Sequence, residues 1–551
     1  MRIRLSIACA VLFSWAAAHA GSGVYDVRDF GAKGDGVTKD TRALQTAIDA
    51  ASRAGGGRVL VPVGTYLTGS LFLRNGVDFH VAAGATVKGS SDKGDYNRWD
   101  VCPQNNRSEA ESHEGGHLFL CIEQHDVTLS GEGTIDGNGT AFAYDRDGRV
   151  AYVHADIVWR PAQMIYFVES ERVGVSGLKL RNAPYWTLLF HGCEHVTVAD
   201  LDVATSVEPL VHNGDGIAID CCEHVSIARC TLDTSDDAID LRANTKPLRR
   251  RRDCAFVTVS DCTISSGQDA IRIGVGDGRV RHASFSDIVV RRARKCAVNF
   301  SATWFPSRGV DFEDISFDRM TVTCPDFGRI HRLFATEDTK VENIRFSNID
   351  ATVERPMRIW ARPGTAPFRN ISFTNVNLTK GVEAFNVEGL TFVGGTAGPA
   401  DLSDAVRERH RRAYLRNPIC LEDYGSLKDN RDVVVYGATK AGMEVAAAAM
   451  RSGKRVLVVE PGESAFELTD PKERRHVDVL VKMVLDESPD GVLLSGDRLT
   501  GFRTEDGRLW LGNEFVDATE GRRLANAVGV NGRTCANLSV VENDKGKGKT
   551  R

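Results

Sequence analysis

Three aspartates stand at matching positions in three similar segments near the middle of the chain. The segments run from Asp215 to Asp220 (DGIAID), from Asp237 to Arg242 (DAIDLR) and from Asp269 to Gly274 (DAIRIG). In each segment the third and fifth residues are apolar, as expected for strand positions that face a core. Superposing the segments places the three leading aspartates in a column, and Asp236 adds a fourth carboxylate beside it.

Such a column of carboxylates has an obvious chemical use. Like charges one or two strand spacings apart repel, so the pKa of at least one of them should rise. Inverting glycoside hydrolysis needs this arrangement, with a protonated carboxyl for the leaving oxygen and an ionised one for water, about 6.5–9.5 Å apart. The competing interpretation is a ladder of turn aspartates or solvated acids, but the convergence of four acids favours catalysis.

A short strand pattern recurs from Val127 to about Gly394 and would position these acids. Apolar and polar residues alternate over four to six positions, and after the first interval the pattern begins again every 19 to 32 residues. Stacked as coils of a right-handed parallel β-helix, such strands pair at about 4.8 Å and align their inward apolar side chains. A β-propeller is disfavoured because its repeats are nearer 40 residues with four strands each. The pattern begins at Val127, Val173, Val196, Val225, Val257, Ala283, Ile315, Ile344, Ile371 and Leu390.

Two further features fit a stack of coils. The stretch Thr41–Arg53 has the apolar spacing of a helix and is predicted to cap the first coil, whose core would otherwise be exposed. Cysteines recur at equivalent repeat positions, in the pairs Cys193/Cys222 and Cys230/Cys262. We interpret them as a ladder of small buried side chains rather than as disulfides. The 13 cysteines form no CxxC pair outside the leader, so no metal site is predicted from them.

Composition limits the class of protein. The 551 residues carry 69 Lys and Arg against 74 Asp and Glu, a formal charge of -5, which argues against a dedicated nucleic-acid binder. With 26% charged and 42% hydrophobic residues the chain is not disordered, and 53 glycines favour a turn-rich β protein. Residues 1–20 resemble a signal peptide, with Arg2 and Arg4 before an apolar run and a small-residue site ending at Ala20. The mature protein is therefore expected to be secreted or periplasmic, with no membrane association after signal removal.

Three runs carry a resemblance to a known family. They are Tyr25–Asp40 (YDVRDFGAKGDGVTKD), Gly133–Gly139 (GTIDGNG) and Arg181–Thr187 (RNAPYWT). Together they resemble the polygalacturonase family, glycoside hydrolase family 28, over about residues 24–395. The resemblance implies a parallel β-helix glycosidase domain over residues 21–398, acting without a cofactor on pectin-like or related plant polysaccharide.

The family's motifs can be carried over residue by residue. Its NTDG motif is matched by Asn213–Gly216, with Gly214 in place of threonine, and its GDD motif by Ser235–Asp237. By that resemblance Asp236 is the general acid, Asp215 together with Asp237 activates water, and Asn213 contacts substrate.

Two family motifs are altered. Where GHG is expected the chain has Gln268–Ala270, so Asp269 replaces the histidine; where RIK is expected it has Asn299–Ser301, which removes the arginine and lysine. Arg272, one coil earlier in the column of Asn299, is a candidate to restore a substrate-facing cation. Arg242 is another, and Gln268 and Asp269 join the candidate substrate contacts.

Other candidate contacts are weaker. The basic run that includes Lys246 and residues 249–252 could form an anionic-polysaccharide subsite, although a charge run is usually a solvated loop. Trp186, Trp304 and Trp360 could stack on sugar faces, although isolated aromatics are more often core.

Two other functions remain open. In a polysaccharide lyase, Asp215, Asp237 and Asp269 would hold Ca²⁺ while Arg272 abstracts a proton. In a carbohydrate-binding β-helix the altered motifs would have lost catalysis.

The composition changes after residue 398. Residues 399–429 read as a charged linker, and residues 430–541 as a partial Rossmann-like segment followed by a basic tail over 542–551. Strands are predicted at 432–437 and 455–460 with a helix at 443–452 between them, the opening of a nucleotide-binding βαβ unit. This part resembles a truncated FAD-dependent oxidoreductase, in which Gly437, Gly442 and Glu460 would contact FAD. Redox catalysis by this short segment alone is not expected.

Overall fold

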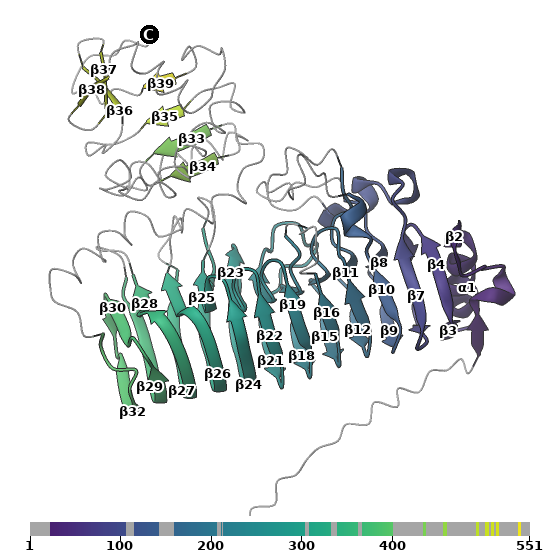
Figure 1. Cartoon of the computed structure of the whole chain (residues 1–551), viewed down its shortest axis with the longest axis horizontal. Helices are drawn as coiled ribbons and strands as arrows, with labels where there is room; N and C mark the ends of the chain where they lie inside the picture. Colours follow the sequence, from purple (N-terminus) through teal and green to yellow (C-terminus); the bar gives the residue numbers. More distant parts are fainter. Residues whose placement is uncertain are drawn as a thin grey trace, which may run out of the picture.

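The structure, a computed structural model, describes most of the first 400 residues. The described ranges are 23–105, 115–142, 159–205, 211, 213–302, 308–331, 339–361 and 366–400, together with short strands beyond residue 400. Parallel strands from successive coils stack along one long axis, with helix α1 at one end (Figure 1). The predicted parallel β-helix is confirmed.

Three columns of parallel strands make up the coils. The first column contains β1 (Val24–Asp26), β3 (Gly57–Val61), β6 (Val77–Val81), β9 (His125–Gly131), β12 (Glu171–Ser176), β15 (Glu194–Ala199), β18 (Glu223–Ala228), β21 (Cys254–Ser260), β24 (Arg279–Ala293), β26 (Asp311–His331), β27 (Val341–Arg355), β29 (Phe368–Leu378), β31 (Val387–Glu388) and β32 (Thr391–Gly395). The second contains β2 (Asp35–Lys39), β4 (Gly64–Thr68), β7 (Ala85–Gly89), β10 (Thr134–Asp136), β13 (Lys179–Arg181), β16 (Asp202–Ala204), β19 (Thr231–Thr234) and β22 (Thr263–Ser266), and then continues into the long strand β24.

The third column carries the candidate chemistry. It contains β5 (Leu71–Phe72), β8 (Phe119–Ile122), β11 (Ile165–Val168), β14 (Leu188–His191), β17 (Ile217–Asp220), β20 (Ile239–Ala243), β23 (Ile271–Gly276) and β25 (Cys296–Ser301), then the end of β26, β28 (Met357–Trp360) and β30 (Val382–Phe385).

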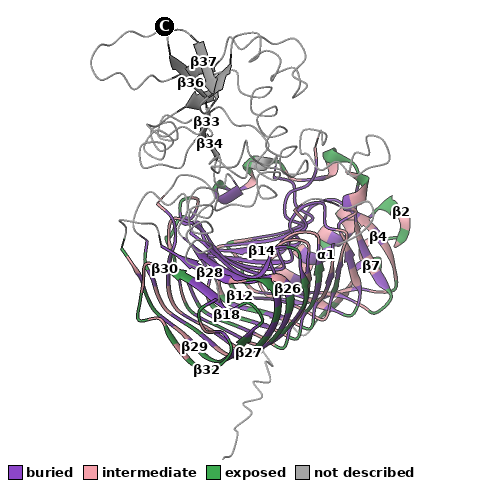
Figure 2. Cartoon of the chain, turned by 60° about the vertical axis from the view of Figure 1, so that its left-hand side comes forward, coloured by how far each residue is buried: buried purple, intermediate pink, exposed green. Residues whose placement is uncertain are grey.

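The predicted repeat sets the register of the first column. Val127, Val173 and Val196 pair in turn, and the predicted repeat starts continue in that register through Ile371. These positions are buried and belong to one hydrophobic core that runs along the whole stack. Figure 2 shows that buried segments recur along the ribbon from coil to coil. Alternation with period two therefore predicted both the strands and the side of each strand that faces the core.

A ladder of phenylalanines fills the interior toward the C-terminal coils. The rings of Phe285, Phe317, Phe346, Phe373 and Phe392 stack from one coil to the next, with centroids 4.8 to 5.1 Å apart. The spacing matches the separation of hydrogen-bonded strands, so the register of the backbone imposes the ring stacking.

Helix α1 (Thr41–Arg53) covers the first coil, as predicted. Leu44, Ala47, Ile48 and Ala51 lie on one side of the helix and are fully buried against the end of the core. Their spacing of three and four residues places them on one helical face. Among the described residues no helix is long and apolar enough to cross a bilayer.

The described cysteines are buried free thiols, including Cys193, Cys222, Cys230 and Cys262. They pack as small side chains along the coils, as the repeat spacing predicts.

Beyond residue 400 the structure describes only strands. Strands β33 (Val433–Tyr436) and β34 (Val456–Val459) pair in parallel, in agreement with the two predicted strands. They share a sheet with β35 (Val492–Leu494) and β39 (Leu538–Val540), and β36 (Phe502–Glu505), β37 (Arg508–Leu511) and β38 (Glu514–Val516) form an antiparallel sheet. The predicted helix at 443–452, the linker, the tail, the signal peptide and the FAD candidates Gly437, Gly442 and Glu460 lie outside the described residues.

Candidate active site

The predicted column of aspartates lies at the start of three neighbouring strands. Ile217, Ile239 and Ile271 pair across β17, β20 and β23. Asp215, Asp237 and Asp269 each stand two residues before one of these isoleucines and are therefore carried in the same register. Asp215 is 5% exposed, Asp237 2% and Asp269 0%, whereas Asp236 keeps part of its surface accessible.

A further acid, which the sequence analysis missed, belongs to this group. One carboxylate oxygen each from Asp215, Asp237 and Asp240 lie within 4.8 Å of one another, and all three residues are buried. Asp240 points outward from β20 at the position of Ala218 on β17 and Arg272 on β23. The same superposition of segments contains the signal, because Asp240 is the only acid at the fourth position of the three segments.

Arg272 is the ionic partner of the proposed base Asp237. Its Nη1 donates to Oδ2 of Asp237 at 2.7 Å, and both side chains are buried. The spacing of the three carboxylate oxygens would also suit a cation, but the guanidinium already lies against one of them and proximity alone does not define a metal site. Arg272 is thus held as the ionic partner of a carboxylate rather than presented to solvent.

Burial and mutual repulsion shift the pKa values of these acids upward. Burial, and then the charge of Asp236, raise the pKa of Asp215 well above its ordinary range. Burial and the charge of Asp237 do the same for the pKa of Asp240. Burial and Asp237 also raise the pKa of Asp236 to about 7, although Lys295 and Arg272 oppose this rise. The group therefore holds protons at neutral pH that isolated aspartates would have lost.

Asp269 occupies the column but its carboxylate turns toward the following coils. It accepts hydrogen bonds from Nδ2 of Asn299 at 2.7 Å and from the thiol of Cys296 at 3.0 Å. Burial opposes its ionisation, but the charges of Lys295 and Arg329 and these hydrogen bonds outweigh burial and lower its pKa. Only its backbone N–H reaches the acidic group, donating to Oδ1 of Asp237 at 2.9 Å. The residues that replace the family's histidine and arginine are thus bonded to each other.

Asn213 lies beside the proposed general acid. Its Nδ2 donates to Oδ2 of Asp236 at 3.5 Å, while its Oδ1 accepts from Nη2 of Arg160 at 3.0 Å. Arg160, just before β11, was not identified from the sequence, where nothing marks it as a neighbour of a residue 53 positions later.

Two other predicted contacts have different surroundings. The backbone N–H of Gln268 donates to Oγ of Ser266 at 3.0 Å, and its half-buried side chain lies next to Asp269 in the chain. Arg242 is only 2% exposed, with its guanidinium 4.6 Å from the ring centroid of Trp186 and its Nε 3.6 Å from Oδ2 of Asp220. It does not face substrate as predicted, because it is enclosed by these partners.

The sugar-stacking candidates also differ from expectation. Trp186 is buried, with Tyr185 stacked on one side at 5.6 Å and Arg242 nearby, so its faces are not open to a sugar. Trp360 is buried as well, and Trp304 lies outside the described residues.

The basic run is largely neutralised by acidic partners. Arg249 pairs with Glu123 at 2.8 Å, Arg251 with Asp277 at 3.2 Å and Arg252 with Glu194 at 2.8 Å. These pairs favour the solvated-loop interpretation over an anionic subsite, because partners within the protein already meet three of the arginines.

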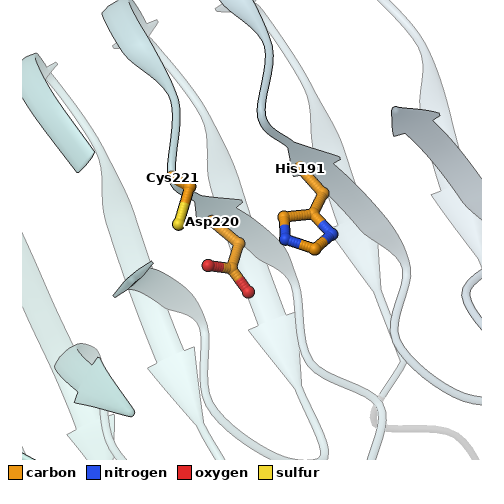
Figure 3. A group of neighbouring side chains, drawn as sticks. All are labelled: His191, Asp220 and Cys221. Atoms are coloured by element: carbon orange, nitrogen blue, oxygen red, sulfur yellow. The ribbon is translucent and has the colours of Figure 1, made fainter. Parts of the chain in front are cut away.

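A second buried group lies beside the site. His191, Asp220 and Cys221, at the ends of β14 and β17, offer ligand atoms within 4.8 Å of one another (Figure 3). Two of the three have protein partners for these atoms. The ring nitrogens of His191 lie 3.2 Å from the Tyr166 hydroxyl and 3.0 Å from the Asn244 carbonyl oxygen, and Asp220 accepts from the Asn244 backbone N–H at 2.7 Å. Burial raises the pKa of the Cys221 thiol well above its ordinary range, which disfavours the thiolate a metal would bind. We interpret this group as structural.

Comparisons with known proteins identify the class to which this fold and site belong. Residues 61–395 match the family model described as glycosyl hydrolases family 28, and residues 24–89 match the model described as rhamnogalacturonase A/epimerase, pectate lyase-like. The first match covers more than half of the chain. The chain belongs to glycosyl hydrolases family 28, as the resemblance in its motifs predicted.

Individual relatives are similar over part of their length. A probable polygalacturonase from Vitis vinifera is 28% identical over 39% of this chain and 43% of its own length. An exo-poly-alpha-D-galacturonosidase from Dickeya chrysanthemi is 25% identical over 40% of this chain and 42% of its own. The matches thus span less than half the length of these curated relatives. The solved exopolygalacturonase from Thermotoga maritima superposes with a TM-score of 0.54 at 21% identity, covering 68% of this chain and 92% of that one, which supports the fold.

Proposed function

We propose that this chain is an exported inverting glycoside hydrolase that cuts pectin-like or related plant polysaccharide. The observation that carries the proposal is the group formed by Asp215, Asp236 and Asp237. It combines a partly exposed acid whose pKa is raised to about 7 by burial with a neighbouring carboxylate that is paired with Arg272. An acid and a base with environments that differ in this way are what inverting hydrolysis requires.

In the proposed reaction one carboxyl gives up a proton and another carboxylate takes one up. Asp236 donates its proton to the glycosidic oxygen as the bond from that oxygen to the anomeric carbon breaks. Asp237, the ionic partner of Arg272, accepts a proton from the water that Asp215 helps to orient, and the oxygen of that water bonds to the anomeric carbon from the opposite face. Arg272 donates to Oδ2 of Asp237 and the backbone N–H of Asp269 donates to its Oδ1, so both oxygens of the base are fixed and the water binds to their remaining lone pairs. Each cycle ends with the proton moved from water to the leaving group, so exchange with solvent restores the acid.

Family membership and the names of the relatives support a pectic substrate. The relatives are described as a probable polygalacturonase and an exo-poly-alpha-D-galacturonosidase. The signal-like N-terminus supports secretion or delivery to the periplasm, where such polymers are encountered. The glycosidase reaction itself is proposed to need no cofactor.

Product analysis tests this proposal. The mature chain from Gly21 onward is incubated with defined pectic oligosaccharides, the fragments are followed by mass, and the anomer first formed is read by proton NMR. We expect new reducing ends of inverted configuration, which the Asp236→Asn variant does not produce. Failure of the wild-type chain to release reducing ends while still binding glycans would favour the carbohydrate-binding alternative.

The lyase alternative loses support from the geometry. Its three predicted ligands do not converge, because the carboxylate of Asp269 is bonded to Asn299 and Cys296. Its predicted base, Arg272, is the cationic partner of Asp237. A lyase would form products that absorb as unsaturated uronides and would lose activity in chelator, so hydrolysis in chelator without such absorbance excludes it.

The function of the segment after residue 400 stays a prediction. Its interpretation as a truncated FAD-binding portion is tested by the absorbance spectrum of the purified full chain, in which a bound flavin would be visible.

A further inference from the structure

We infer that Arg160 is a positioning residue for the proposed general acid, because it fixes the amide of Asn213 with its N–H groups directed at Asp236. The inference rests on the proposed function for the role of Asp236. It concerns a residue that lies in none of the family-like motifs and makes no hydrogen bond to Asp236 among the described contacts.

Arg160 is itself rigidly held. It is 7% exposed, its guanidinium lies 4.5 Å from the ring centroid of Tyr185, and its Nη1 donates to the carbonyl oxygen of Pro184 at 3.2 Å. Tyr185 in turn stacks on Trp186 with ring planes 10° apart. A guanidinium clamped on an aromatic face has few alternative rotamers, so the position of its Nη2 is well defined.

The chemistry of the two side chains fixes the orientation of the amide. A guanidinium carries only donors, whereas an asparagine amide has an acceptor end and a donor end. The 3.0 Å contact from Nη2 of Arg160 therefore requires Oδ1 of Asn213, which leaves Nδ2 facing Oδ2 of Asp236 at 3.5 Å. A flipped amide would place Oδ1 against the carboxyl and lose both contacts.

The amide of Asn213 is one of several groups that act on Asp236. Asp237 follows it in the chain and repels its charge, while Lys295, between β24 and β25, and Arg272, on β23, attract it. Burial lowers the pKa of Arg160 to about 10, although the charges of Asp215 and Asp236 oppose this fall. Arg160 therefore remains a cation at neutral pH. The N–H of Asn213 favours the ionised form of Asp236 and orients the carboxyl for the return of its proton.

The Arg160→Met variant tests the role, since methionine keeps the packing on Tyr185 and removes every donor. We expect the upper pH limit of kcat/KM to move upward by about half to one pH unit, because Asp236 loses a donor to its ionised form. We expect kcat to fall about tenfold or more with KM nearly unchanged, because the acid is less well placed. The matched control is Arg281→Met, which removes an arginine over the ring of Phe256 in the first strand column and should leave the profile unchanged.

A double-mutant cycle separates positioning from a direct effect of charge. If Arg160 acts mainly through the amide, Asn213→Ala alone reproduces most of the pH shift, and adding Arg160→Met causes only a smaller further shift from the direct attraction between Arg160 and Asp236. An equal shift from Arg160→Met in the Asn213→Ala background would overturn the inference, because it would show a direct electrostatic effect. An unchanged profile in both single variants would overturn it as well.

A readout that does not need turnover keeps this test distinct from the test of the proposed function. Carboxyl carbons of aspartate are labelled with ¹³C in the full chain, and the Asp236 resonance is assigned by its loss in Asp236→Asn. We expect its titration midpoint to rise in Arg160→Met, provided that thermal unfolding shows the variant to be folded. A midpoint identical to that of the wild type would overturn the inference even if no substrate were ever found, whereas an inactive wild type with the shifted midpoint would count only against the proposed function.

Discussion

The inner and outer sides of the third strand column carry different kinds of side chains. On the inner side, Phe119, Ile165, Leu188, Ile217, Ile239, Ile271 and Val298 follow one another in register, and all are buried and apolar. On the outer side, Leu120, Tyr166, Leu189 and Ala218 give way to Asp240, Arg272, Asn299, Arg329 and Arg358. Both sides belong to the same strands. The inner residues maintain the packing of the core, so the residue types on the outer side can vary without changing the fold.

The largest expected effect comes from removing the proposed acid on the outer side. Asp236→Asn should reduce kcat by about 10²–10⁴-fold, because the leaving oxygen must then depart without a proton. The melting temperature should stay the same or rise, since the change relieves repulsion from Asp237. Reducing-end assays and calorimetry on one preparation check both statements. A parallel loss of activity and of stability would contradict the separation of the two sides.

Truncating the phenylalanine ladder in the interior should lower stability and leave activity unchanged. Phe317, fully buried between Phe285 and Phe346, loses its stacking in Phe317→Ala, and the free energy of unfolding should fall by about 3–5 kcal/mol. The kcat of the folded fraction should be unchanged. Denaturant unfolding together with active-site-normalised rates measures this, and Phe317→Leu, which leaves a smaller void, provides the graded control.

The pH dependence of activity should reflect the ionisation of the proposed acid and should not depend on the apolar core. The pKa of Asp236 is raised to about 7, first by burial and then by Asp237. As the proposed general acid it must be protonated, so kcat/KM should fall about tenfold per pH unit above that value. A profile of kcat/KM between pH 4 and 9 tests this. Constant activity up to pH 9 would argue against Asp236 as the acid.

Removing the unpaired acid should stabilise the fold at neutral pH. Both carboxylate oxygens of Asp240 are buried without a hydrogen-bond partner among the described residues, and burial raises its pKa. A raised pKa means that the folded state binds the proton more tightly than the unfolded state, so stability falls as pH rises above the unfolded pKa. Asp240→Asn should therefore gain about 1–2 kcal/mol at pH 7 and little at pH 4, as measured by urea unfolding at both values. A gain that is larger at pH 4 would have the wrong sign.

The smallest effect is expected in the basic run. Arg251, with its side chain 72% exposed, pairs with Asp277 at 3.2 Å. Arg251→Ala should change stability by less than about 1 kcal/mol and leave KM for anionic oligosaccharides unchanged. A clear rise in KM would restore the anionic-subsite interpretation of this run.

The sequence predicted the repetitive part of the molecule better than the irregular part. Period-two alternation located the strands from Val127 to Ile371 in their true register, because the same apolar side must face the core in every coil. The superposition of the segments also predicted correctly that Asp215 and Asp237 lie close together, because stacking makes equivalent positions of successive coils neighbours.

Prediction was poorer for the orientations of individual side chains. Arg242 was expected to face substrate but turns onto Trp186, and Asp269 turns toward Asn299. Arg160 reaches Asn213 from outside the repeat, so no spacing rule relates the two. Rotamers and contacts between loops depend on tertiary neighbours that periodicity does not encode.

The stacking of coils also sets how the molecule should come apart. The strand hydrogen bonds of each coil run only to the coil before and the coil after it, so opening can begin at an end and advance without breaking the strand pairing of distant coils. Helix α1 closes one terminus, whereas the aspartates that we assign to catalysis lie many coils inward from it. Amide hydrogens near β17 and β20 should accordingly exchange with deuterium among the slowest in the chain, and the acids should keep their arrangement while the outermost coils fray.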